Sequence, residues 1–205
     1  MQPLSPVRDI PLPTHQPTQA LSIELMGIQY PFRDLKHLLG AADISKAGER
    51  MAGLAATDEV EREAARILLA SLTLKQLYDM PLLDNHGKID AVMQVNYDMD
   101  LNKFAQIAPM TLGELKNHLL ASKGEEIRAV GQAMTGVMVS ALTKLLDVHE
   151  LILLGKRLKK SASAKARTQV GLSGTLSSRL QPNHPTDNLS GITMLAYTGF
   201  SMGAG

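Results

Sequence analysis

The sequence predicts a mainly α-helical domain followed by the first β-strand and α-helix of a TIM-type (β/α)8 barrel that this chain leaves incomplete. Three observations predict this fold class. Apolar residues recur from Tyr30 to Leu158 with the three- and four-residue spacing of buried helix faces. The next segment is basic and rich in small residues. Polar and apolar residues then alternate between 171 and 182, which indicates a strand, before helical spacing returns.

Residues 1–22 are expected to form a flexible, Pro-rich tail, because proline lacks an amide donor and disfavours helix in the residue before it. The tail lacks the apolar segment of a signal peptide. Lys and Arg number 21 and Asp and Glu 20, so the overall charge gives no indication of a nucleic-acid or membrane partner. No uncharged run has the apolar length of a membrane span. We therefore expect a cytoplasmic protein.

The helical domain is expected to span 23–158. Its first helix should bury a stripe of apolar residues, and a second helix should lie around 45–56. Thr57 is expected to cap a third helix that begins at Asp58, whose acidic first turn complements the helix dipole. The first stripe consists of Phe32, Leu35, Leu38 and Leu39.

Two candidate capping boxes, Thr73 with Gln76 and Thr111 with Glu114, should each open a short helix. The longest helix is expected from Glu125 to Leu146, with its methionines filling gaps in a helix interface. This segment also supports an alternative function: a non-catalytic helical interaction module in which Glu125–Leu146 docks a partner helix.

Residues 159–170 are expected to form a basic linker between domains. Lys159–Arg167 could instead be an anion or nucleic-acid patch, but it lacks the interleaved aromatic residues that base stacking would use. The linker is the favoured interpretation.

Residues 171–205 are expected to form the first strand and helix of the barrel. Glycines in the segment and the closing Pro182 favour a strand over a helix. Thr186 or Asp187 should cap the following helix. One face of the strand carries Ser173, Thr175, Ser177, Arg179 and Gln181, the other carries Leu172, Leu176 and Leu180, and the helix has an apolar stripe of Leu189, Ile192, Ala196 and Phe200.

The two faces of this strand predict different roles. The leucine face suits an outer layer of helices, whereas small polar residues on the other face would leave room for a ligand. Arg179 and Gln181 lie at the carboxyl end of the strand, where barrel enzymes place functional groups. A cationic fork and an amide could together bind a small polar substrate. The alternative is that Arg179 is an ordinary surface residue or ion-pair partner.

The stretch Thr175–Asn183, with the ending Gly199–Gly205, closely resembles the large subunit of adenosylcobalamin-dependent ethanolamine ammonia-lyase. Tyr30–Leu35 and Ala52–Ala56 also resemble the helical N-terminal region of that subunit. The similarity runs from about Glu24 to Gly205 and is most specific at the RLQPN motif within it.

The resemblance implies a helical domain, a TIM-type barrel and conversion of ethanolamine to acetaldehyde and ammonia by a radical mechanism. It implies that Arg179 binds the substrate hydroxyl and Gln181 the amine, with no catalytic residue within this chain. Adenosylcobalamin, the small subunit and other large subunits are the implied partners, and the cofactor contacts are expected mainly in parts that this chain lacks. The chain alone is therefore expected to be inactive. Housing in a bacterial microcompartment stays open.

Other chemistry is not indicated by the sequence. The absence of Cys excludes a thiolate nucleophile and Cys-ligated metal, and the six histidines lack the spacing of a helical zinc site. Asp84–Gly87 weakly resembles a calcium loop, but it lacks the ligand pattern, and a capped turn is the favoured interpretation. No metal site is expected.

Overall fold

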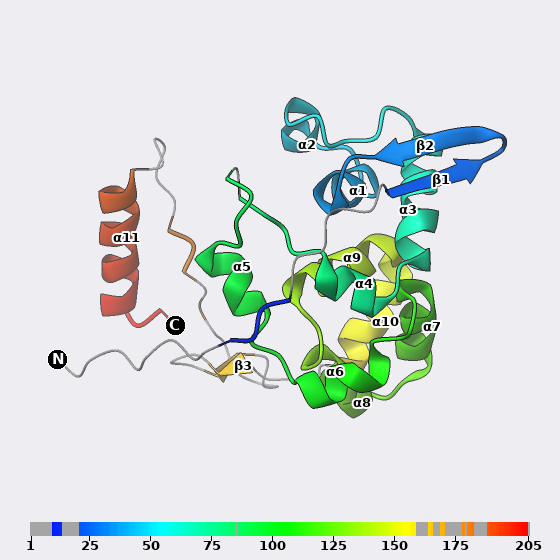
Figure 1. The fold of residues 1–205 in the computed structure, drawn as a ribbon. Helices are drawn as coiled ribbons and strands as arrows, with labels where there is room; N and C mark the ends of the chain where they lie inside the picture. Colours follow the sequence, from blue (N-terminus) through cyan, green and yellow to red (C-terminus); the bar gives the residue numbers. More distant parts are fainter. Residues whose placement is uncertain are drawn as a thin grey trace.

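The computed structural model describes residues 10–13, 21–84, 86–158, 164–165, 169–170, 178, 180–182 and 188–204. This part of the chain is mostly helical, with short antiparallel strand pairs (Figure 1). The elements are β1 (Leu21–Leu25), β2 (Ile28–Phe32), α1 (Leu35–Ala41), α2 (Ala47–Met51), α3 (Glu59–Ser71), α4 (Leu74–Asp79), α5 (Ala91–Asn96), α6 (Leu101–Ile107), α7 (Leu112–Ala121), α8 (Gly124–Gly131), α9 (Gly136–Leu145), α10 (Val148–Leu158), β3 (Ala164–Lys165), β4 (Gln169–Val170) and α11 (Leu189–Ser201).

The predicted helical domain is confirmed as a mainly helical body, whereas the barrel unit stays a prediction. Most of the strand expected at 171–182 lies outside the described residues, and 178 and 180–182 have no regular secondary structure. The helix expected after it is present as α11, which Figure 1 shows in red, apart from the other helices. Asn188 caps α11 by accepting the amide of Gly191 at 2.9 Å, so the cap expected at 186 or 187 was placed too early.

A β-hairpin precedes the helices, and the sequence argument missed it. β1 pairs antiparallel with β2, and the turn between them places Met26 at φ 54° and Gly27 at φ 78°. Positive φ at both turn positions matches the right-handed twist of the two strands, which is why this tight connection closes a hairpin. Helical structure therefore starts at Leu35 rather than at Tyr30, and the domain boundary expected after residue 22 falls inside β1.

A helix cap fixes where α3 begins, whereas α2 has no side-chain cap. α2 lies inside the range 45–56 in which a helix was expected. The cap of α3 is Asp58, which accepts the amide of Glu61 at 2.8 Å. The expectation that Thr57 caps this helix was wrong by one residue, because both the amide and the hydroxyl of Thr57 donate to the Glu61 carboxylate.

Both predicted capping boxes are confirmed, and they lie against each other. Thr73 and Thr111 form an antiparallel bridge at the starts of α4 and α7. The Leu74 amide donates to Met110 at 2.9 Å, and the Leu112 amide donates to Leu72 at 2.9 Å. Two helix starts that are far apart in the sequence are thereby joined through their backbones.

The single long helix expected at 125–146 is wrong, because the chain breaks between α8 and α9. Thr135 is buried and caps α9, and the first amide of α9, that of Gly136, donates to the Asn96 side chain at 2.9 Å. The apolar residues of this segment are buried in the chain's own core, so they do not form the exposed face that docking of a partner helix would need. They are Ile127, Val130, Val137, Ala141 and Leu145.

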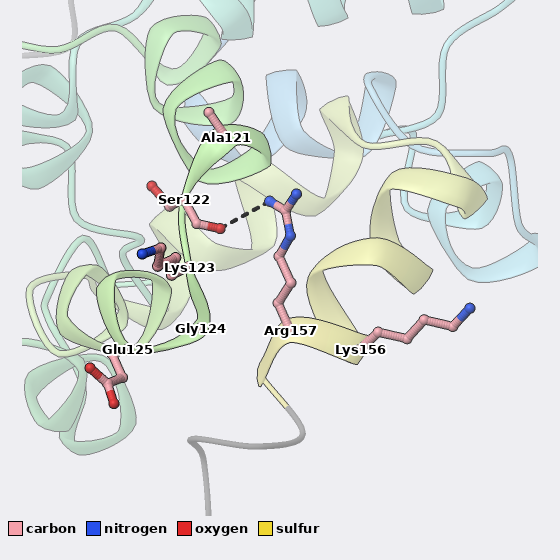
Figure 2. Close-up of a pocket in the computed structure, with 7 residues that line it drawn as sticks. All are labelled: Ala121, Ser122, Lys123, Gly124, Glu125, Lys156 and Arg157. Carbon is pink, nitrogen blue, oxygen red and sulfur yellow. Dashed lines mark hydrogen bonds between the residues drawn. The ribbon is translucent and has the colours of Figure 1, made fainter.

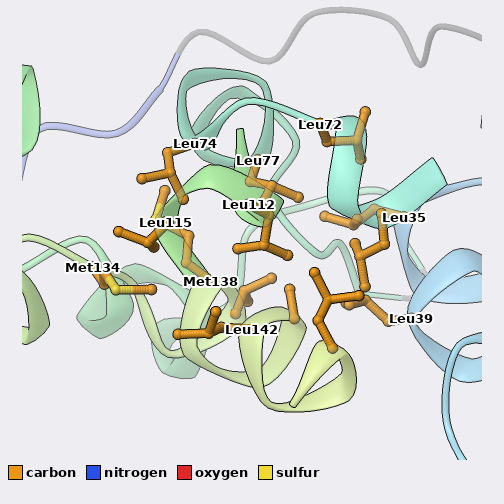
Figure 3. Packing of buried hydrophobic residues seen from close by; sticks show 14 of the residues in the cluster. Leu35, Leu39, Leu72, Leu74, Leu77, Leu112, Leu115, Met134, Met138 and Leu142 are labelled. Atoms are coloured by element: carbon orange, nitrogen blue, oxygen red, sulfur yellow. The ribbon is translucent and has the colours of Figure 1, made fainter. Parts of the chain in front are cut away.

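The core runs through the middle of the helical body, where leucines from several helices meet (Figure 3). Leu74 and Leu112, from the two bridged helix starts, are fully buried there. Met134 and Met138 fill the space between α9 and its neighbours, as predicted for flexible thioethers. None of the helices that the structure describes is long and apolar enough to cross a membrane.

Candidate substrate-binding rim

The two predicted substrate-binding residues belong to the connection that enters α11. Gln181 is described and exposed, whereas Arg179 lies outside the described residues. Between them in the sequence, Leu180 is partly buried. The structure therefore places one of the two predicted polar groups at the surface and leaves their mutual geometry a prediction.

Leu180 packs on α11 at Gly199. A Cβ built on Gly199 would lie 2.8 Å from Leu180 Cδ2, which is closer than Cβ atoms approach in real proteins, and 3.1 Å from Cγ, which is tighter than most Cβ contacts. Leu180 thus faces α11, while the neighbouring Gln181 is exposed. The strand alternation expected at 171–182 stays a prediction.

The end of α11 is closed by a turn that again involves Gly199. The amides of Met202 and Ala204 donate to the Gly199 carbonyl at 3.2 and 3.1 Å, and Gly203 has φ 87°, a conformation that favours glycine. Because Gly199 has no side chain, Leu180 can approach the helix closely at this position. The Gly199 carbonyl in addition accepts hydrogen bonds from the closing turn. The sequence analysis assigned no role to Gly199, although a glycine inside a helix can indicate a close packing contact.

A hollow of about 590 Å³ lies where the end of α7, the start of α8 and the end of α10 meet (Figure 2). Arg157 donates to Ser122 O at 2.9 Å and also to Leu120 O, and in this way it satisfies carbonyls at the end of α7. Lys156 points away from Arg157. Because the cations do not converge, this hollow is a helix-end contact rather than a rival substrate site.

Comparison with known proteins identifies a family for the part of the chain that includes the rim residues. The sequence model of the family described as Ethanolamine ammonia lyase large subunit (EutB) matches residues 30–205. The chain belongs to this family. The match includes the helical body, Arg179, Gln181 and Gly199.

Curated relatives support the same family. The ethanolamine ammonia-lyase large subunits of Salmonella typhimurium (strain LT2) and Escherichia coli (strain K12) are each 32% identical to this chain over 189 residues. The aligned region covers 90% of this chain and 41% of each relative. The chain therefore spans less than half the length of the large subunits that it matches.

The part of this family member that the structure describes offers no metal centre. Its His, Asp and Glu side chains form no group of three that could hold an ion. The loop at Asp84 is a capped turn, as predicted, because the Asp84 carboxylate accepts the amides of His86 at 2.8 Å and Lys88 at 2.9 Å. The Asp84 carboxylate thus stabilises its own loop by hydrogen bonds to the backbone.

Perturbed ionisable groups lie in the helical body. Burial raises the pKa of Tyr97 far above its ordinary value, and the Tyr97 hydroxyl donates to Tyr78 O at 3.0 Å. Burial, and then the charge of Arg33, lowers the pKa of His37. Both groups are fixed by packing and local hydrogen bonds, so these shifts indicate structural rather than catalytic roles.

Proposed function

We propose that this protein acts as an ethanolamine ammonia-lyase large subunit and takes part in the conversion of ethanolamine to acetaldehyde and ammonia. The observation that supports this most strongly is the family match, which includes the RLQPN motif at 179–183. A function based on the helical body alone has less support, because the helix face proposed for a partner is buried in the core.

At the rim, Arg179 is proposed to donate a hydrogen bond to the substrate hydroxyl oxygen. Its planar guanidinium holds several donors in a fixed geometry, which suits orientation of a small polar molecule. Gln181 is proposed to accept a hydrogen bond from the substrate amine through its amide oxygen. Its exposure leaves this amide free to face a substrate. Two fixed contacts at opposite ends of ethanolamine would hold its reacting carbon in one orientation.

Adenosylcobalamin is the proposed cofactor, and it would supply the radical that removes a hydrogen from the substrate. Two hollows in the described residues are the helix-end contact at Arg157 and an apolar depression of about 490 Å³ at Val92 and Val95. The cofactor contacts are proposed mainly in parts of the large subunit that this chain lacks.

The proposed protein partners are the small subunit of the lyase and other large subunits, in the cytoplasm or in a bacterial microcompartment. A tagged small subunit, co-expressed with a full-length large subunit that carries this sequence, should retain the large subunit on an affinity column. Elution of the small subunit without it would contradict the partnership.

An ammonia-release assay tests the activity. The full-length large subunit, combined with the small subunit, should release ammonia from ethanolamine only when adenosylcobalamin is added. Arg179→Ala and Gln181→Ala should each lower kcat/KM by about 100-fold or more, because misplacing a reactant by about 1 Å can cost that much. Lys156→Ala, a change at an exposed helix residue, is the matched control and should retain wild-type kinetics. Wild-type kinetics for both rim variants would reject their role.

A further inference from the structure

Gly199 is the described residue whose lack of a side chain has the clearest steric cause near the rim. It lies inside α11, where glycine is less favourable than alanine because it has more backbone freedom to lose. Gly155 in α10 has no such contact, because a Cβ added there would meet nothing. At Gly199 the added Cβ would collide with Leu180.

Relief of the collision requires the Leu180 side chain to move, at Cγ as well as at its two terminal methyl groups. Three atoms of the Leu180 side chain lie within 3.1 Å of the added Cβ, and one of them is Cγ, the branching atom. Moving Cγ requires rotation about χ1 or a shift of the backbone. Because Gln181 follows Leu180 directly, a shift of the Leu180 backbone also displaces the amide that the proposed function assigns to the substrate amine.

We infer that the Leu180–Gly199 contact positions the substrate-binding rim, and that Gly199 is a positioning residue for binding of ethanolamine. The glycine sets how closely the segment at Leu180 approaches α11, and this distance sets where Gln181 presents its amide. This inference rests on the proposed function, because it assigns the effect of the contact to the same substrate.

The turn after α11 is a second reason why substitution of Gly199 should affect this end of the helix. Its carbonyl accepts two amides of the closing turn, so this end of the helix is held from both sides. A substitution at Gly199 therefore meets both the Leu180 side chain and the closing turn. A substitution at Gly155 meets neither of them.

The test uses the full-length large subunit with its small subunit, ethanolamine and adenosylcobalamin. Gly199→Ala should raise KM for ethanolamine and lower kcat/KM by about 10- to 100-fold, the scale expected for misplacement of a bound reactant. Its Kd for adenosylcobalamin, measured by visible absorption, should stay at the wild-type value. A purely structural defect would change cofactor binding and substrate kinetics together.

A second substitution should rescue the first. In Gly199→Ala combined with Leu180→Ala, the new methyl group occupies space that the leucine has vacated, and kcat/KM should recover by about 10-fold relative to Gly199→Ala alone. Leu180→Ala by itself cannot create a clash, so it tests the positioning role if Gly199→Ala fails to fold. It should raise KM because the rim loses its support. Gly155→Ala is the matched helix-glycine control and should keep wild-type kinetics.

The outcomes separate this inference from the proposed function. If Gly199→Ala and Leu180→Ala keep wild-type KM while Gln181→Ala loses activity, the positioning role is overturned and the proposed function stands. If Gln181→Ala and Arg179→Ala also keep wild-type kinetics, the substrate role of the rim is rejected, and the positioning role with it. Rescue in the double variant, with cofactor binding unchanged, supports the inference.

Discussion

Single residues at the start of α1 combine helix capping with packing. Asp34 accepts the amide of His37 at 2.7 Å, and His37 Nδ1 in turn accepts the amide of Arg33 at 3.2 Å. The His37 ring also lies against Phe32, with 5.7 Å between the ring centroids. A protonated Nδ1 could not accept the Arg33 amide, so this arrangement requires the neutral ring on that side.

Stability should therefore depend on pH through His37. Burial, and then the charge of Arg33, lowers the pKa of His37 below its ordinary value of 6.5, so the unfolded chain binds this proton at a higher pH than the folded chain does. The contribution of His37 to the free energy of unfolding is fully present above pH 6.5 and is lost as the pH falls through the lower folded-state pKa.

Urea unfolding over this pH range checks the prediction. In His37→Gln the free energy of unfolding should fall less between about pH 7 and pH 5 than in the wild type. His86→Gln, in an exposed turn, is the control and should follow the wild-type profile. Equal pH profiles for the wild type and His37→Gln would contradict the assignment.

Between elements, a charged contact ties the end of α1 to α9. Lys144 Nζ lies 2.7 Å from Asp43 Oδ2, and only 13% of the Lys144 side chain is exposed. The Lys144 carbonyl also accepts a hydrogen bond from Arg66 Nε of α3 at 3.1 Å. Burial by itself would raise the pKa of Asp43, but the hydrogen bonds from Lys144 and the Ile44 amide outweigh it and lower the pKa.

Breaking this tie should destabilise the helical body. Lys144→Met should lower the free energy of unfolding by about 1–2 kcal/mol at neutral pH, because a partly buried carboxylate loses its main partner. The matched control is Lys46→Met: Lys46 reaches the same carboxylate at 3.3 Å but is 61% exposed, so its loss should cost less than about 0.5 kcal/mol.

The same pair makes stability depend on pH in the same direction as His37 does, but in a more acidic range. The lowered pKa of Asp43 means that its contribution is present above its ordinary value of 3.8 and is lost as the pH falls through the folded-state value. The difference in unfolding free energy between the wild type and Lys144→Met should shrink there. An equal loss of unfolding free energy in Lys144→Met and Lys46→Met at neutral pH would contradict the larger contribution expected from the less exposed lysine.

Across the whole molecule, α11 differs from the other long helices because none of its residues is buried. Large apolar side chains on different sides of this helix are exposed, which is unfavourable for a helix that has no further neighbours. They include Leu189, Met194, Leu195, Tyr197 and Phe200. In the predicted barrel, where helices pack around the outside of the strands, α11 would bury part of this apolar surface.

A charge placed on α11 should therefore act only in the full-length subunit. Tyr197 is 68% exposed, so Tyr197→Lys should leave urea unfolding of this chain's helical body within about 0.5 kcal/mol of the wild type. In the full-length large subunit the same change should greatly reduce the yield of soluble protein, because it would bury an unpaired charge. Met26→Lys, at the exposed hairpin turn, should leave that yield unchanged. A full soluble yield of Tyr197→Lys would argue against a covered α11.

The sequence by itself determined the features that depend on local chemistry. The capping boxes at Thr73 and Thr111 and the capped turn at Asp84 follow from side chains that bond to backbone a few residues away. The family also followed from local motifs. Such interactions form within one short segment, so its pattern is sufficient to predict them.

Only the tertiary structure decided the features that depend on distant partners. The break before Thr135 exists because Asn96 meets the start of α9 there, and the hairpin is held by residues that pack on helices much later in the chain. Gly199 became meaningful only when Leu180 was found against it. Contacts of this kind balance a local preference against the free energy of burial elsewhere, and that balance is set by three-dimensional packing rather than by residue spacing.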